Sequence, residues 1–252
     1  EHGRATITLN RPEMHNAFDD TLISALIEEF RRLERERNVR VVLLAAKGKS
    51  FSSGADLNWM RRMADYSFEG NRNDAMALAE LMKTLANLSK PTIALVQGAA
   101  IGGGVGLVAC CDIALATENA SFCLSEVKLG LIPAVISPYV STAIGARATR
   151  RYFLTAERFD ANEACRLGLV HEVVPIEDLV EHADALSRRL LLNGPQAMAS
   201  VKALVAEVAL SSLDDDLIAD TAERIAEIRA SAEGREGLSA YLEKRDPNWV
   251  KG

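Results

Sequence analysis

The stretch IGGGVGLVACCD, residues 101–112, has three consecutive glycines and a fourth at Gly106. It follows PTIALVQG (91–98), whose apolar run predicts a buried strand, and residues 104–110 favour a short helix. Small residues at such a strand-to-helix junction let a ligand approach the backbone closely, or they serve tight turns and close helix packing. The spacing alone leaves both interpretations open.

A second loop has the same setting. VRVVLLAA (39–46) predicts another buried strand, FSSGAD (51–56) is rich in turn-forming residues, and residues 57–64 favour a helix. A helix N-terminus carries unpaired N–H groups and a partial positive charge. Two such N–H groups, one from each loop, could converge on one carbonyl oxygen and form an oxyanion hole from backbone alone.

The alternation of strands and helices predicts an α/β core with mainly parallel strands. Other strands are expected at 5–12 and 112–116, and other helices at 19–35 and 70–88. After about residue 145 helical patterns dominate, with one strand-like segment at 169–174. These helices are expected at 147–156, 160–167, 176–192, 195–210 and 213–231. We expect 1–190 to form the α/β core and 191–252 a C-terminal helical region.

Composition excludes several classes of protein. The chain has 252 residues, of which 48% are apolar, enough to bury a large core. No segment approaches the roughly 20 apolar residues of a membrane helix. The net charge is −6 with dispersed basic residues, so we expect no nucleic-acid partner. The opening EHGRATITLN lacks the features of a signal peptide, which favours a cytoplasmic protein.

Metal and nucleotide motifs are absent from the sequence. The histidines show no metal-ligand spacing, so no metal site is expected. A P-loop would need glycine at Leu43, and a G-x-G-x-x-G motif would need glycine at Leu107. The cysteines lack a CxxC pattern and are expected to be buried free thiols in a reducing compartment. They are Cys110, Cys111, Cys123 and Cys165.

Five segments together resemble a known family. They are LNRPEMHNAF (9–18), FSSGADL (51–57), GAAIGGGVGLVACCDIALA (98–116), SEVKLGLIP (125–133) and LSAYLEKRDPNWVKG (238–252). They are similar to the N-terminal turn, the two oxyanion loops, the catalytic segment and the C-terminal helix of the crotonase superfamily, also called the enoyl-CoA hydratase/isomerase family. The resemblance runs nearly end to end.

The resemblance implies a fold, an assembly and a substrate. The fold would be α/β, a crotonase (ClpP-like) spiral of ββα units with a C-terminal helical region that trimerises. Trimers of this family often pair as hexamers. The substrate would be an acyl-CoA thioester, and no cofactor is expected because coenzyme A is part of the substrate.

The same resemblance implies catalytic roles. The amides of Ala55 and Gly103 would hold the thioester carbonyl and stabilise an enolate-like state, with each donor worth about 3 kcal/mol. A bulky side chain at Gly103 would crowd the thioester. Glu126 would transfer protons, either to the α-carbon or from a water attacking the β-carbon, and burial would raise its pKa. The alternative is a solvated Glu126 paired with Lys128.

Further residues are expected to line the substrate site. They are Gly54, Asp56, Leu57, Gly102, Pro133, Arg11, Lys244 and Arg245. Asp56 would cap the helix after its loop, and Gly102 would serve the turn. The three cations would face the CoA phosphates, with Lys244 supplied by a neighbouring subunit, or they are solvated surface charges. Trp59 would border the acyl pocket or simply pack.

One carboxylate of the family pattern is missing. Two-acid hydratases of this family carry a first Glu where this chain has Gly106. A double-bond shift needs one base that removes and returns a proton, whereas hydration with Glu126 alone needs help. Ser137, Tyr139 or a carboxylate on the substrate would supply it.

The reaction is inferred from resemblance. GGGVGLVACCDIA, IPAVISPYV and RRYFLTAERF (150–159) are similar to bacterial hydratases of branched glutaconyl-CoA esters, of the 3-methylglutaconyl-CoA and isohexenylglutaconyl-CoA types, which act in leucine or acyclic terpene catabolism. We therefore expect an enoyl-CoA hydratase. The alternatives are an enoyl-CoA isomerase with Glu126 as sole base and acid, and an inactive CoA-binding member of the family.

Overall fold

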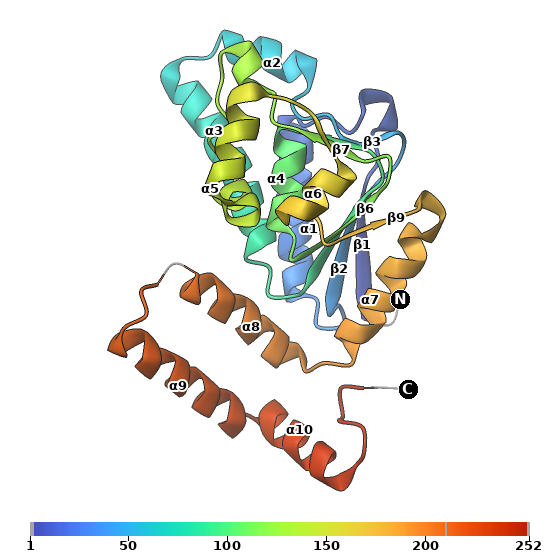
Figure 1. The fold of residues 1–252 in the computed structure, drawn as a ribbon, viewed down its shortest axis with the longest axis vertical. Coiled ribbons are helices and arrows are strands. Elements are labelled where there is room, and N and C mark those ends of the chain that lie inside the picture. Colours follow the sequence, from blue (N-terminus) through green and yellow to red (C-terminus); the bar gives the residue numbers. More distant parts are fainter. Residues whose placement is uncertain (1–2, 210, 251–252) are drawn as a thin grey trace.

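The computed structural model describes residues 3–209 and 211–250 (Figure 1). Outside the described residues are 1–2, 210 and 251–252. The predicted core 1–190, the predicted C-terminal region 191–252 and the predicted helix 195–210 each include some of them.

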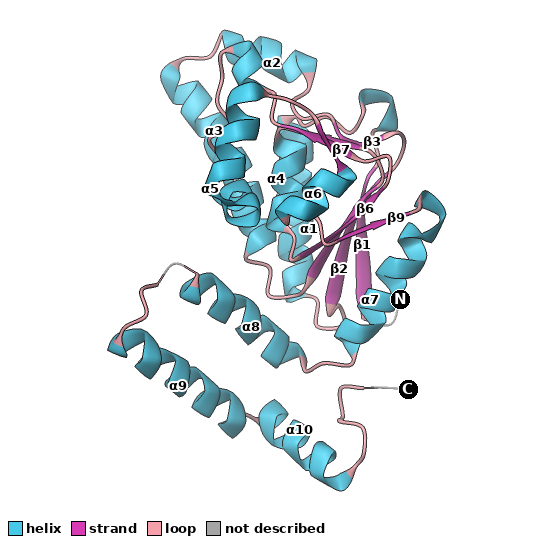
Figure 2. Cartoon of the chain, in the orientation of Figure 1, coloured by secondary structure: helices cyan, strands magenta, loops and turns pink. Residues whose placement is uncertain are grey.

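A five-stranded parallel sheet forms the base of the core, in the order β1-β2-β4-β6-β9 (Figure 2). Its strands are β1 (Arg4–Leu9), β2 (Val41–Ala46), β4 (Thr92–Val96), β6 (Ile113–Thr117) and β9 (Glu172–Val174). Side chains alternate between the two faces of a strand. Val42 and Leu44 therefore join the main core, whereas Val41 and Leu43 join a smaller cluster covered by α7 (Leu179–Leu191). Both faces are buried, which explains the continuous apolar runs in the sequence.

A second, smaller sheet has the order β3-β5-β7-β8. Its strands are β3 (Ser50–Ser52), β5 (Ala99–Ile101), β7 (Ser121–Cys123) and β8 (Phe159–Asp160). The first three pair in parallel, and each follows a strand of the large sheet. Helices come after the first two of these strand pairs, so the chain winds in the expected ββα spiral. The sequence placed β3 and β5 in loops, because three-residue strands carry no readable period.

The core helices are α1 (Asp20–Arg35), α2 (Leu57–Ala64), α3 (Phe68–Ala86), α4 (Gly103–Cys110), α5 (Ser137–Thr155) and α6 (Ala161–Leu167). Short 3₁₀ turns lie at η1 (Pro12–Met14), η2 (Glu126–Leu129) and η3 (Ile176–Asp178). Helix α1 buries Ile23, Leu26, Phe30 and Leu33, at helical spacing. Helix α4 is buried along most of its length, which explains why it has no polar face.

Helix α5 is longer than the predicted 147–156. It begins at Ser137, with Pro138 in its first turn, and breaks at Gly145, whose φ of 74° is left-handed. Pro138 and Gly145 interrupt the helical spacing of apolar residues, so the sequence predicted only the second half of the helix.

The C-terminal arm consists of α8 (Pro195–Val208), α9 (Asp215–Ala230) and α10 (Ala232–Glu243), which lie apart from the two sheets (Figure 1). Helices α8 and α9 bury no residue. Polar contacts tie the arm and tail to the core. Among them, Lys202 pairs with Asp112 at 2.7 Å, and Arg40 donates to the Trp249 carbonyl at 2.8 Å. Exposed apolar side chains in this region include Val201, Val205, Ile218, Ile225, Leu238, Tyr241 and Leu242.

The four cysteines are free thiols. Cys110 and Cys123 are buried as expected, but Cys111 and Cys165 are only half-buried, because they lie at the end of α4 and on the outer helix α6. Within the described ranges, no His, Cys, Asp and Glu side chains gather in a group able to hold a metal ion. No helix of the described chain has the length and apolarity needed to cross a membrane.

Candidate active site

The glycine loop begins α4 with an unpaired amide. Gly102 is the residue before the helix, and its φ of 52° and ψ of −117° suit only glycine. Its own N–H donates to the Cys123 carbonyl at 2.9 Å. The next amide, of Gly103, is in the first turn of α4, where N–H groups lack a helical partner. It donates no backbone hydrogen bond to any described residue.

The loop before α2 presents a second unpaired amide. Ala55 lies between two residues that both bond to Phe18: the Phe18 N–H donates to the Gly54 carbonyl at 2.7 Å, and the Asp56 N–H donates to the Phe18 carbonyl at 2.8 Å. In this parallel bridge the central residue directs its own N–H and C=O to the opposite side. The Ala55 amide is therefore free to meet a ligand.

Strand pairing brings the two loops together. β3 and β5 are parallel neighbours, so their carboxyl ends lie at one edge of the small sheet. A Cβ on Gly54 would stand 3.0 Å from the Ile101 carbonyl oxygen, and one on Gly104 would stand 2.9 Å from the Ser52 carbonyl oxygen. The loops touch through backbone, which only glycine permits at these positions. These glycines therefore serve close packing, and the approach of a ligand to the backbone stays a prediction.

Glu126 lies against the glycine loop. β7 pairs with β5 and leads into η2, which starts at Glu126. A Cβ on Gly102 would stand 2.9 Å from Glu126 Oε1. Its other oxygen, Oε2, is buried without a hydrogen-bond partner, and burial raises the pKa of the carboxyl group. The alternative pairing with Lys128 does not occur among the described ion pairs.

Two of these glycines also make close contacts that the sequence did not predict. A Cβ at Gly103 would stand 3.2 Å from Cε2 of the Phe18 ring, so the ring limits this position. Gly102, predicted to serve the turn and to line the substrate site, also leaves the space that the Glu126 carboxylate occupies. The sequence did not single out Phe18, since a lone aromatic before a capping Asp is no distinctive signal.

Gly106 faces an apolar wall. A Cβ there would stand 2.3 Å from Cγ2 of Ile136 and 3.1 Å from Cε of Met82. Ile136 is 2% exposed, so the space beyond Gly106 is filled by a packed side chain. A carboxylate at this position would collide with Ile136, which the sequence analysis did not identify.

The two candidate helper residues have contacts of their own. Ser137 Oγ donates to the Ala134 carbonyl at 2.8 Å, which closes the turn that leads into α5. Tyr139 lines a pocket of about 290 Å³ with Cys111 and His171, at the C-terminal end of α4. That end is opposite to the one that presents Gly103. Among the described residues neither hydroxyl forms a hydrogen bond with Glu126, and the help expected from them stays a prediction.

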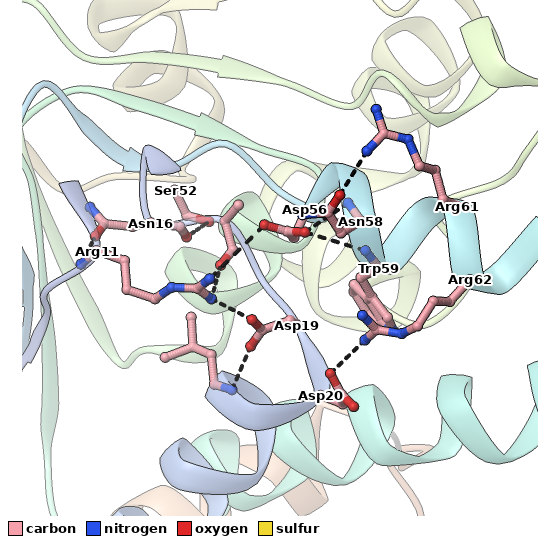
Figure 3. Close-up of polar contacts among 12 residues, drawn as sticks. Arg11, Asn16, Asp19, Asp20, Ser52, Asp56, Asn58, Trp59, Arg61 and Arg62 are labelled. Carbon is pink, nitrogen blue, oxygen red and sulfur yellow. Dashed lines mark hydrogen bonds and ion pairs between the residues drawn. The ribbon is translucent and has the colours of Figure 1, made fainter. Parts of the chain in front are cut away.

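Asp56 caps α2 as predicted. Its carboxylate accepts hydrogen bonds from the Asn58 and Trp59 amides. Arg11 lies beside it, with its guanidinium 2.7 Å from Asp19 and 4.0 Å from Asp56 (Figure 3). These ion pairs tie the starts of α1 and α2 together. Contact of Arg11 with CoA stays a prediction.

The remaining predicted residues lie in varied environments. Leu57 is 66% exposed on α2, and Pro133 is buried after η2. Trp59 is buried and donates to Asp74 on α3 at 2.9 Å, so it packs between helices. Lys244 follows α10 with an exposed side chain, and Arg245 pairs with Glu236 and Glu243. Within one chain, this end of the arm lies far from α4 (Figure 1).

A family model described as enoyl-CoA hydratase/isomerase matches residues 1–252. The 2,3-dehydroadipyl-CoA hydratase of Escherichia coli is 30% identical over 244 residues, which cover 96% of this chain and 93% of the relative.

Solved structures are similar along nearly the whole chain. An enoyl-CoA hydratase from Shewanella pealeana is 53% identical with a TM-score of 0.96, covering 98% of this chain and 92% of that one. The Pseudomonas aeruginosa protein AtuE is 35% identical with a TM-score of 0.94, covering 100% of this chain and 97% of its own.

Proposed function

Since the chain belongs to the enoyl-CoA hydratase/isomerase family, we propose that it hydrates the 2,3-double bond of a branched glutaconyl-type CoA thioester. It is an enzyme of this family, and acyl-CoA hydration is the activity that its relatives' names indicate. The glutaconyl substrate is proposed from the three segments in the glycine loop, after Pro133 and in α5. A dicarboxylic thioester is also named for the Escherichia coli relative.

One observation carries the proposal: a half-buried carboxylate lies against a loop that offers a free amide. Glu126 Oε1 is next to Gly102, and the Gly103 amide follows directly. Ala55 offers a second amide from the neighbouring loop. A carboxylate beside two unpaired donors suits a substrate that gains negative charge on a carbonyl oxygen while a proton moves nearby.

The proposed reaction proceeds through an enolate. The thioester oxygen accepts hydrogen bonds from the Ala55 and Gly103 amides. Glu126 takes a proton from water as the water oxygen bonds to C3, and the π electrons of the double bond move onto the thioester oxygen. The carboxylic acid thus formed returns its proton to C2, which restores the carbonyl and the Glu126 carboxylate. Burial raises the pKa of Glu126, which makes its carboxylate a stronger base toward water. The raised pKa also lets the carboxylic acid hold the proton until C2 accepts it.

Because the first acid of the family pattern is missing, few groups are left that could assist Glu126 in hydration. Ile136 fills the space beyond Gly106, Ser137 donates to the turn before α5, and Tyr139 lies at the other end of α4. We therefore assign both proton transfers to Glu126. A glutaconyl substrate has its own carboxylate, which is the remaining group able to position the water.

The same observation favours a second candidate, an enoyl-CoA isomerase. A shift of the double bond from the 3,4 to the 2,3 position needs one group that removes a proton at C2 and returns it at C4. Glu126 alone satisfies this requirement, and an apolar wall at Gly106 and Ile136 would keep water away from the enolate.

We also propose that the active enzyme is a trimer or a pair of trimers. The exposed apolar residues of the C-terminal arm suit burial against other copies. In such an assembly Lys244 would reach a neighbouring subunit's CoA phosphates, with Arg11 and Arg245 as further candidate contacts. Lys244→Ala should then raise KM for acyl-CoA about 3-fold or more while leaving kcat nearly unchanged.

Two substrates separate the candidate reactions. Hydration of 3-methylglutaconyl-CoA removes the double bond conjugated with the thioester, so its absorbance falls. Isomerisation of a 3-enoyl-CoA creates that conjugation, so its absorbance rises. We expect hydration, seen as the fall in absorbance, to be faster than isomerisation. Glu126→Gln should slow hydration at least ~100-fold. A faster rise on the 3-enoyl substrate would identify an isomerase, and full turnover by E126Q would remove Glu126 from the mechanism.

A further inference from the structure

Phe18 touches the backbone around both candidate oxyanion donors. Its backbone brackets Ala55, with bonds of 2.7 Å to the Gly54 carbonyl and 2.8 Å from the Asp56 amide. Both bonds lie on the same side of the loop, so they turn the Ala55 N–H away from Phe18. A shift of residue 18 would therefore rotate or displace the Ala55 amide.

The side chain of Phe18 reaches the other donor. Its Cε2 and Cδ2 atoms lie 3.2 Å and 3.4 Å from the position that a Cβ on Gly103 would occupy. The residue is 1% exposed, so the ring is held on all sides by the core. The ring thus acts as a spacer that limits how closely the first turn of α4 approaches the Ala55 loop.

The segment before Phe18 is fixed by a buried side chain. Asn16 is fully buried, and its Nδ2 donates to the Lys47 and Ser50 carbonyls, both at 2.9 Å. Its carbonyl accepts from Ser52 Oγ at 2.9 Å (Figure 3). Residue 16 has a left-handed φ of 54°, which asparagine tolerates better than most residues. Phe18 is therefore attached to a rigid turn.

We infer that Phe18 is a positioning residue that sets the separation and direction of the Ala55 and Gly103 amides. The inference rests on the proposed function, in which these two amides bind the thioester oxygen. Misplacement of a catalytic group by about 1 Å can slow a reaction ~100-fold. A smaller side chain at position 18 should let α4 and the Ala55 loop move relative to one another, without changing any group that contacts CoA.

The first test compares two equal substitutions in the same core. Phe18→Leu should lower kcat about 10-fold or more while KM stays within about 3-fold. Phe30→Leu is the matched control, because Phe30 is also fully buried but packs from α1 and touches neither donor. It should lower the melting temperature similarly and leave kcat within about 2-fold of wild type. Phe18→Met, which keeps more side-chain volume, replaces F18L if that variant does not fold.

The second test reads the amides directly. A conjugated, chromophoric acyl-CoA thioester absorbs at longer wavelength when hydrogen bonds polarise its carbonyl. We expect a red shift on binding to wild type and to F30L, and a smaller one on binding to F18L. If F18L gives the full red shift and the wild-type kcat, the positioning role of Phe18 is overturned, while the proposed oxyanion hole stands. A wild-type protein that binds the thioester without any shift would instead overturn the proposed oxyanion hole.

Discussion

At the scale of single residues, the burial that suits Glu126 to its proposed catalytic role also destabilises the fold. Its Oε2 is buried without a partner, and burial raises its pKa above the ordinary value of 4.5. A raised carboxyl pKa means that the folded protein holds the proton more tightly than the unfolded chain does. The charged form therefore destabilises the fold above the folded-state pKa, and this penalty disappears below the unfolded-state pKa.

This sign predicts that Glu126→Gln is more stable than wild type at neutral pH, because a neutral amide costs less to bury than a carboxylate. The difference in free energy of unfolding should shrink as pH falls from 7 through the folded-state pKa, and vanish near pH 4. Chemical denaturation of both proteins across this range measures it. A variant that is less stable than wild type at neutral pH would contradict the assigned environment of Glu126.

A substitution at Gly106 tests whether Ile136 and Met82 fill the space beyond this glycine. Gly106→Glu should destabilise the protein by about 3 kcal/mol or more, because its Cβ would collide with Ile136 and an unpaired carboxylate would be buried. Gly106→Glu combined with Ile136→Ala should recover part of that loss by removing the colliding atoms. Thermal melts of the two variants and of Ile136→Ala alone make the comparison. Equal stability of G106E and wild type would show that Ile136 does not fill this space.

At the scale of elements, segments with a clear apolar pattern were predictable, and the three-residue strands of the small sheet were not. Strand β4 is a continuous apolar run and helix α1 has an apolar period of about 3.6 residues, and the sequence places both correctly. The three-residue strands β3 and β5 have none, yet their pairing brings the two loops together. The sequence located the loops through their glycines, but which glycine faces the carboxylate depends on contacts between segments far apart in the chain.

The cap of α2 links element stability to the site. Asp56→Ala removes the acceptor for the Asn58 and Trp59 amides and should cost about 1 kcal/mol of stability. It should also lower kcat, because Ala55 directly precedes the cap. Asp214, which caps α9 in the same way, provides the control. Asp214→Ala should show a similar or smaller stability loss with unchanged kcat, and a D56A enzyme with full kcat would separate the cap from the site.

At the scale of the whole molecule, the C-terminal arm exposes apolar residues on helices that bury nothing. Ile218 and Ile225 of α9 are 56% and 47% exposed. They are two helical turns apart and lie on one face. Replacing both with Glu should convert an assembly of trimers into monomers, seen as a fall in solution mass, whereas Glu223→Gln on the same helix should not. A wild-type protein that is already monomeric would contradict the proposed assembly.

The central claim is that the Ala55 and Gly103 amides bind one thioester oxygen beside Glu126. A crystal structure of the enzyme with an unreactive acyl-CoA thioester analogue tests it most directly. We predict that the thioester oxygen lies about 2.7–3.1 Å from both amide nitrogens, with Glu126 facing C2 and C3. A complex in which the oxygen contacts neither amide, or in which Glu126 faces away from those carbons, would contradict this account.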